Sequence, residues 1–129
     1  MKRPALLIAT ECKTARFDTL AKRAQLPFGD GVADGRNDYS LKDAWRLRLM
    51  LDAPKGIDND TAQFIAKEST YILGDLPFYY AEGVTLYAGA MYVDGQRVAV
   101  AGRMSDIAEL AHPVTGINAG MKRGGLVLL

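Results

Sequence analysis

The chain is poor in the residues that cross-link a fold or bind a metal. Among its 129 residues there is one cysteine, Cys12, and one histidine, His112. An intrachain disulfide is therefore excluded, and a zinc site would lack ligands. A single cysteine fits a reducing compartment, so we expect a cytoplasmic protein. No apolar run approaches the roughly 20 residues of a membrane-spanning helix, and we expect no membrane partner, metal or cofactor.

Motifs of catalysis are missing as well. The sequence has no phosphate-binding loop of the P-loop type and no nucleophile motif, and the spacing of its carboxylates singles out no acid–base pair. The aspartates of segment 27–38 do not match a calcium-binding loop. We interpret His112 as a loop residue and Cys12 as a packing residue. We therefore expect that the protein is not an enzyme. A small enzyme with an unrecognised carboxylate site is the least favoured functional hypothesis.

The composition is that of an ordinary globular domain, with 49% hydrophobic and 24% charged residues. The charge is uneven along the chain. Residues 1–50 hold ten basic and six acidic residues, a net +4, whereas residues 51–129 hold six and nine, a net −3. This asymmetry suggests that the first half faces an anion. The alternative is that these are ordinary solvated charges.

Short periodic segments fill the first half of the chain. Residues 4–9 are apolar, and their small number favours a strand over the start of a helix. A helix is predicted next, capped by Thr14 or Asp18 and ending near Gln25. The glycine- and aspartate-rich segment 27–38 is predicted to be a loop. The apolar face of the predicted helix consists of Phe17, Leu20, Ala21 and Ala24.

Two further helices are marked by their caps. Ser40, with Asp43 three residues later, predicts a helix that begins with a variant of the capping box. Arg48 and Asp52 are four residues apart on that helix, and we expect them to form an ion pair. The apolar face of this helix is predicted to be Leu41, Ala44, Trp45 and Leu49, with Leu47 and Leu51 widening it.

The third helix has the clearest boundaries. Asp58 or Asn59 can cap its start, the apolar period continues to Leu73, and Gly74 follows where a C-terminal cap belongs. Its apolar stripe is predicted to be Ala62, Ile65, Ser69 and Ile72.

From residue 78 onward the pattern is that of β-structure. Segments 84–93 and 96–104 are separated by Asp94-Gly95, which predicts a hairpin with a type I′ turn. A short helix is expected to begin at Ser105. The apolar residues 126–129 are expected to form a strand or a subunit contact. Because both faces of the first hairpin strand are apolar and unpaired strand edges invite pairing, we expect a homo-oligomer, most simply a dimer.

The predicted fold class is therefore α+β. A helical, helix-turn-helix-like region spans residues 1–75, and a region containing the β-hairpin spans residues 76–129. We expect the two regions to pack as one compact unit.

Three short motifs stand out in the first half of the chain: Phe17-x-x-Leu20-Ala21-Lys22-Arg23-Ala24-x-Leu26, Arg36-x-x-Tyr39-Ser40-x-x-Asp43-x-x-x-Leu47, and Gly56-Ile57 with Ala62 and Ile65. Together they resemble the winged helix-turn-helix of the MerR family. In that family the wing arginine and tyrosine contact DNA, which implies that Arg36 and Tyr39 lie at DNA with Lys22 and Arg23 as neighbours.

Two functional hypotheses follow from the sequence. The first is a regulator that binds duplex DNA through basic residues of the helical half, while the β half dimerises or binds an effector. Its expected DNA-binding residues are Lys22, Arg23, Arg36, Tyr39, Lys42 and Arg46. The alternative is a structural or assembly protein, for example of the phage or prophage type, whose β segment makes subunit contacts. The first requires the basic residues on one face, and the second requires an exposed apolar edge.

Overall fold

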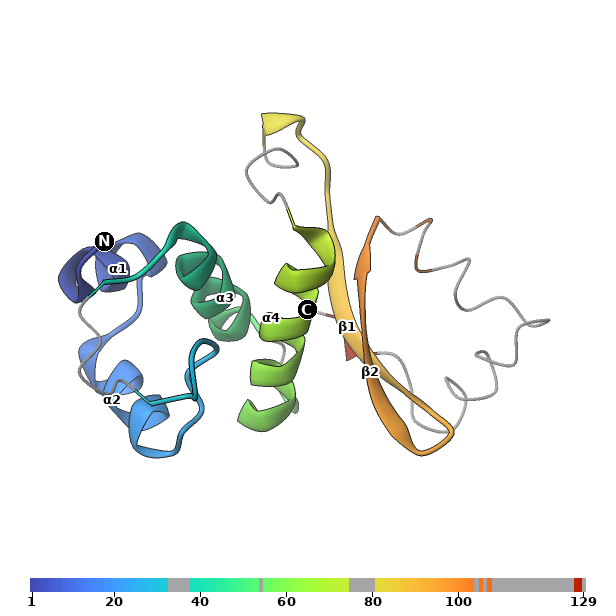
Figure 1. Cartoon of the computed structure of the whole chain (residues 1–129), viewed down its shortest axis with the longest axis horizontal. Helices are drawn as coiled ribbons and strands as arrows, with labels where there is room; N and C mark the ends of the chain where they lie inside the picture. Colours follow the sequence, from blue (N-terminus) through green and yellow to red (C-terminus); the bar gives the residue numbers. More distant parts are fainter. Residues whose placement is uncertain are drawn as a thin grey trace.

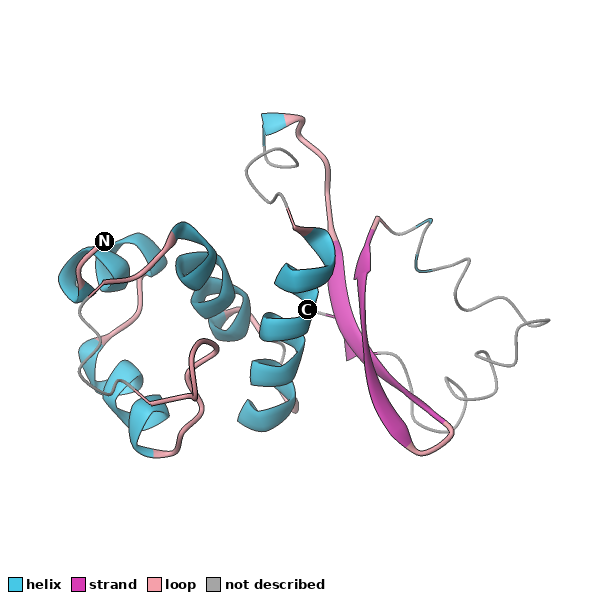
Figure 2. Ribbon diagram, in the orientation of Figure 1, coloured by secondary structure: helices cyan, strands magenta, loops and turns pink. Residues whose placement is uncertain are grey.

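The computed structural model of the chain describes residues 1–32, 38–53, 55–74, 81–103, 105, 107 and 127–128. These residues form helices and an antiparallel sheet, so the predicted α+β class is confirmed. Figure 1 shows helices on one side, the sheet on the other and helix α4 (Asn59–Leu73) between them; Figure 2 shows the same division by secondary structure. The elements are α1 (Arg3–Thr10), α2 (Thr14–Lys22), α3 (Leu41–Leu51), α4 (Asn59–Leu73), β1 (Tyr87–Val93), β2 (Gln96–Gly102) and β3 (Val127–Leu128).

The first element is a helix, and the strand predicted for residues 4–9 is wrong. Pro4 lies in the first turn of α1, where its missing N–H is not needed. Leu6 and Thr10, four residues apart, are the buried positions of this helix. The hydroxyl of Thr10 donates a hydrogen bond to the Leu6 carbonyl over 2.8 Å. The small number of apolar residues in segment 4–9 did not predict its secondary structure, because a helix this short is stabilised by packing on the core.

Helix α2 has the predicted apolar face but different ends. Its N-cap is Lys13, without a side-chain cap, rather than Thr14 or Asp18. The helix ends at Lys22 instead of near Gln25, because Ala24 adopts a left-handed conformation with φ of 54°. In the part of segment 27–38 that the structure describes, the chain forms no helix or strand, as predicted.

The caps of α3 and α4 are confirmed. Ser40 accepts a hydrogen bond from the Asp43 amide, and Asp43 accepts one from the Ser40 amide, which completes the capping box. Asp58 caps α4, and Gly74, with φ of 68°, ends it. Of the apolar face predicted for α3, Ala44 and Leu47 are buried and Trp45 is half-buried; Met50, which was not part of that face, is buried as well. Two residues of the predicted apolar faces are exposed instead of buried, Leu41 on α3 and Ile72 on α4.

The hairpin is also confirmed. Strands β1 and β2 pair in antiparallel register from Tyr87–Gly102 to Val93–Gln96. Asp94 and Gly95 have φ of 50° and 79°, and a type I′ turn needs positive φ at both positions. Strand β3 pairs with β1 on its other side, which gives the sheet order β2-β1-β3. Of the helix predicted to start at Ser105, the structure describes that residue and Ile107, both helical.

Helix α4 is shared by two apolar clusters. Its Ala62 and Ala66 belong to the core of the helical region, together with Phe17 and Leu47. Its Ile65 packs instead against Ala88 and Ala90 of β1. One helix therefore joins the helical region to the sheet.

The winged helix-turn-helix resemblance is not confirmed. Between α2 and α3 the structure describes residues 23–32 and 38–40, and these contain neither a helix nor a strand. Within the described residues, no helix has the length and apolar character needed to cross a bilayer.

Candidate interaction surfaces

Basic side chains gather on the exposed side of α2. Lys22 and Arg23 lie at the end of this helix and are exposed. Arg16 is seven residues before Arg23, so both lie on the same side of the helix; Arg16 donates a hydrogen bond to the Asn59 side chain over 3.1 Å. The acidic residue of α2, Asp18, forms an ion pair with Arg3 of α1. The outer side of α2 therefore carries net positive charge.

The two basic residues predicted on α3 differ in their surroundings. Lys42 is exposed, whereas Arg46 is half-buried against α4. Arg46 donates from Nε to the Thr70 hydroxyl over 2.6 Å and from Nη2 to the Lys67 carbonyl over 3.4 Å. Its guanidinium therefore links α3 to α4.

Tyr39 belongs to the core of the helical region. Its side chain is 2% exposed, and its ring lies edge-on to Phe17 and Phe28, with centroids 6.4 and 5.5 Å away. The backbone amide of Tyr39 donates to the Met1 carbonyl over 2.7 Å. Arg36, predicted to lie beside it at DNA, is outside the described residues.

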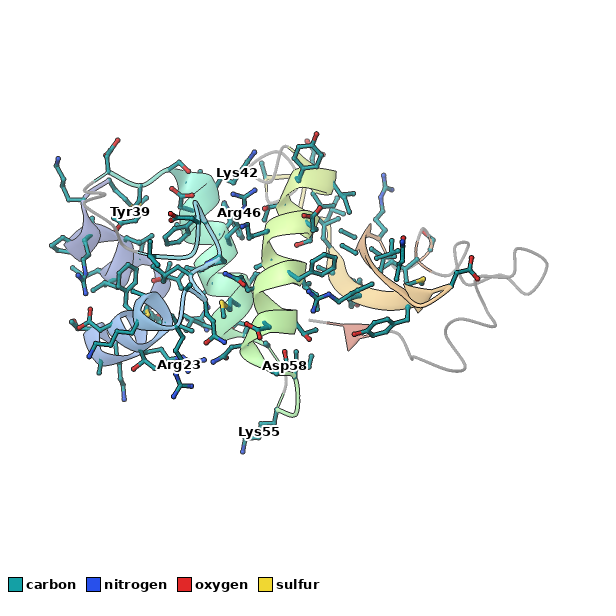
Figure 3. All side chains as sticks on the ribbon, turned by 60° about the horizontal axis from the view of Figure 1, so that its bottom comes forward. Arg23, Tyr39, Lys42, Arg46, Lys55 and Asp58 are labelled. Carbon is teal, nitrogen blue, oxygen red and sulfur yellow. The ribbon has the colours of Figure 1, made fainter. Side chains whose placement is uncertain are left out.

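The described DNA-binding candidates do not share one face. In Figure 3, Lys42 and Arg46 lie at one side of the helical region, and Arg23 lies at the opposite side, near Lys55 and Asp58. The Tyr39 side chain lies within the buried core of the helical region. The structure therefore brings Lys22 and Arg23 together on α2 and separates them from Lys42 and Arg46.

Cys12 and Arg48 occupy the junction of α1, α2 and α3. Cys12 is buried, and this burial raises the pKa of its thiol despite the nearby Arg16 and Arg48. Arg48 pairs with Asp52 as predicted, and the hydrogen bonds that the guanidinium donates to that carboxylate raise the pKa of Arg48. The part of the chain that the structure describes holds no group of three His, Cys, Asp or Glu side chains placed to bind a metal.

The outer edge of β2 directs backbone N–H and C=O groups away from β1. In a two-residue hairpin the residues that flank the turn, Val93 and Gln96, form a hydrogen-bonded pair, and bonded pairs then alternate along the ladder. Every second residue of β2 therefore directs its N–H and C=O away from β1. Among the described residues, β2 has a strand on one side only. The outward-directed residues are Arg97, Ala99 and Ala101.

Among the described residues, this edge lacks a bulge, a proline and a lysine, three features by which sheets block further pairing. Each residue of β1 faces one residue of β2, so neither strand contains a bulge. Strand β2 contains no proline or lysine. Its one charge, on Arg97, is turned onto α4, where the guanidinium lies 4.2 Å from the centroid of the Phe64 ring. Arg97 also donates to the Thr61 hydroxyl over 3.5 Å.

An exposed aromatic side of α4 lies next to the same edge. Because Arg97 of β2 contacts Phe64 and Thr61, this side of α4 lies over β2. Tyr71 is seven residues after Phe64 and so lies on the same side of the helix. Its side chain is 78% exposed, and that of the following residue, Ile72, is 51% exposed. The exposed aromatic side of α4 and the outer edge of β2 are therefore adjacent.

The sequence contained a signal for this edge. The Asp94-Gly95 turn fixes the register of the hairpin, and the register fixes which residues of β2 point outward. No comparable signal marks Arg46 as a contact between helices, because its partner Thr70 lies 24 residues away along the chain.

Comparison with known proteins adds no relative. No family model matches the chain, and neither curated proteins nor solved structures give a match.

Proposed function

We propose that the chain is a structural or assembly protein that joins copies of itself through the edge of its sheet. The observation that carries this proposal is the outer edge of β2, which has no bulge, directs its one charged side chain onto α4 and lacks a strand partner among the described residues. Free edges of this kind pair with other strands unless the fold blocks them. The proposal gives the β half the role of the subunit contact.

The exposed side of α4 supports the same role. Large apolar side chains that gather beside an open edge indicate a contact surface, since single exposed apolar residues are common but clustered ones are not. Tyr71 lies on the side of α4 over β2, and the next residue of the helix, Ile72, is also exposed. A second copy that pairs with β2 would cover part of this surface.

The test measures molar mass by light scattering over a concentration series. We expect the chain to have at least twice its monomer mass at micromolar concentration. Val98→Lys places a charge on the edge strand and should return the chain to the monomer. Ile8→Lys is the matched control, because Ile8 is an exposed apolar residue of α1, far from the sheet (Figure 1). A chain that stays monomeric at high micromolar concentration would contradict the proposal.

Duplex-DNA binding is a second candidate, favoured by the cationic side of α2. Lys22, Arg23 and Arg16 can approach phosphates together, because Asp18 is engaged by Arg3. Arg46 and Tyr39 are left out of this surface, since one links two helices and the other is buried.

A salt series with a fluorescent random duplex tests this candidate. Replacing Lys22 and Arg23 with alanine should weaken binding and reduce the slope of log K against log salt by about one unit per lost phosphate contact. Lys42→Ala is the control, because Lys42 lies on the other side of the helical region (Figure 3). Absence of binding by the unmodified chain at low salt would overturn DNA binding and leave the assembly proposal intact.

A further inference from the structure

We infer that two copies pair β2 against β2 in antiparallel register about a two-fold axis at Ala99, so that their sheets become continuous and their α4 helices lie side by side. This inference rests on the proposed assembly function and specifies its partner, a second copy, and its register. It is carried by the hydrogen-bonding pattern of β2, by the position of its one charge and by the placement of α4.

The backbone pattern selects the register. The residues of β2 that direct N–H and C=O outward are Arg97, Ala99 and Ala101. With the axis at Ala99, each of them faces an outward residue of the second copy: Ala99 faces Ala99, and Arg97 faces Ala101. Shifting the axis by one residue, to Val98, leaves Ala101 without a partner within β2. The Ala99 register therefore satisfies the most backbone groups of this strand.

Charge and side-chain size favour the same register. An axis at Arg97 would place two guanidiniums opposite each other, and like charges directly opposite are destabilising. With the axis at Ala99, Arg97 faces an alanine, and Val98 faces Val100 of the second copy on the other face of the sheet. Facing β-branched side chains are favourable cross-strand neighbours.

The position of α4 allows the second copy to approach. A two-fold axis that relates antiparallel strands is normal to the sheet, so both α4 helices lie on the same face. Helix α4 contacts both β1 and β2, which places its axis between them. The two helices are then separated by two strand spacings, about 10 Å. Packed helices lie 8–10 Å apart, so the copies fit without a gap or a collision.

The facing sides of the two helices carry aromatic side chains, with the exposed Glu68 between them. The side of α4 over β2 carries Phe64, half-buried under Arg97, and Tyr71, which is 78% exposed. In the inferred dimer these two rings face the same side of the second α4 and lose their exposure to water. Burial of two aromatic side chains from each copy adds stability to the hydrogen bonds of the strand edge.

Disulfide trapping with single introduced cysteines tests the register. In a hydrogen-bonded antiparallel pair the Cα atoms are about 5.5 Å apart, which suits a disulfide. We expect Ala99→Cys to form a cross-linked dimer under mild oxidation, with at least about tenfold more product than Ala101→Cys. Ala101 is the matched control, because it points the same way and its inferred neighbour is Arg97. The unmodified chain reports any cross-linking through Cys12.

A second variant covers the case in which Ala99→Cys does not fold. The double variant Arg97→Cys/Ala101→Cys brings two cysteines together at each end of the pairing and should cross-link, whereas neither single variant should. Molar mass from light scattering separates the two proposals. A dimer that cross-links at Ala101 alone, or at none of these positions, overturns the register and leaves self-assembly standing. A monomer at every concentration overturns both.

Discussion

Arg48 of α3 donates a hydrogen bond from Nη1 to the backbone carbonyl oxygen of Thr10, 2.7 Å away at the end of α1. The last carbonyl groups of a helix have no partner within the helix, so this bond satisfies a group that would otherwise need water or a cap. The same guanidinium pairs with Asp52 one turn further along α3. Arg48 therefore connects α1 to α3 while its charge is neutralised from its own helix.

The contact with Thr10 should contribute more to stability than the ion pair. Arg48→Met keeps most of the packing and removes both interactions, and we expect it to lower the free energy of unfolding by about 1–2 kcal/mol. Asp52→Asn removes the carboxylate alone and should lower it by less than about 1 kcal/mol, because the pair is exposed. Urea denaturation measures both values. Equal losses in the two variants would assign the stabilisation to the ion pair.

Two glycines with similar backbone conformations should respond differently to alanine. Gly31 has φ of 89° and Gly56 has φ of 95°. A Cβ at Gly31 would lie 2.2 Å from the Ala24 carbonyl oxygen, whereas a Cβ at Gly56 meets nothing within 4 Å. That carbonyl is held by the Gln63 side chain, which donates to it over 3.0 Å, so the backbone is not free to move aside.

Gly56→Ala should therefore lower the free energy of unfolding by the conformational penalty of about 1–2 kcal/mol. Gly31→Ala adds the clash and should lower it by more than about 3 kcal/mol. Chemical denaturation of the two variants checks this difference. Similar losses would show that the turn at Gly31 adjusts to the added methyl group.

Substitutions at Ser40 and Thr14, two of the residues predicted to cap helices in the N-terminal half, should have different effects on stability. Ser40 accepts a hydrogen bond from the Asp43 amide over 3.1 Å, so Ser40→Ala should destabilise the fold by about 1 kcal/mol. Thr14 is exposed and is the first residue of α2, after the N-cap Lys13. Thr14→Ala should therefore change stability by less than about 0.5 kcal/mol. Thermal unfolding followed by circular dichroism measures both, and a loss at Thr14 as large as that at Ser40 would contradict this assignment.

These caps also indicate which parts of the fold could be predicted. Ser40, Asp58 and Gly74 set their helix ends through bonds with residues three or four positions away, so the local sequence was sufficient. The Asp94-Gly95 turn determined the hairpin in the same way. Helix α1 was missed because its stability comes from Leu6 and Thr10 packing against the rest of the helical core, and a six-residue apolar window contains no information about that contact.

For the candidate surfaces, too, the sequence predicted local features but not those that depend on contacts between distant residues. The exposure of Lys22, Arg23 and Lys42 could be inferred from their places on the polar sides of the helices. Their separation could not, because it depends on how α2 and α3 pack. Arg46 was indistinguishable from a surface charge in the sequence, since Thr70 is distant in the chain. For Arg48 the sequence predicted the pair with Asp52 but not the bond to the Thr10 carbonyl, because Thr10 is also distant in the chain. The outward-directed residues of β2 could be predicted, because a two-residue turn determines the register of the hairpin.

The cap of α4 should make stability depend on pH in the acid range. The Thr61 amide donates to the Asp58 carboxylate over 2.7 Å, and this bond lowers the pKa of Asp58 in the folded chain. A lowered folded pKa means that the ionised carboxylate stabilises the fold above the unfolded pKa of about 3.9. This stabilisation is lost as the pH falls through the folded pKa.

Asp58→Asn keeps a capping oxygen but does not titrate, and it removes a negative charge at the N-terminus of α4, where that charge is favourable. We therefore expect a higher melting temperature for the unmodified chain than for Asp58→Asn at neutral pH. The difference should shrink below about pH 4 and vanish once Asp58 is protonated in both states. Ser40→Ala is the control, because its hydroxyl cap does not titrate and its effect should stay constant with pH. A difference between the unmodified chain and Asp58→Asn that persists unchanged at pH 2 would show that the carboxylate charge at this cap does not stabilise the fold.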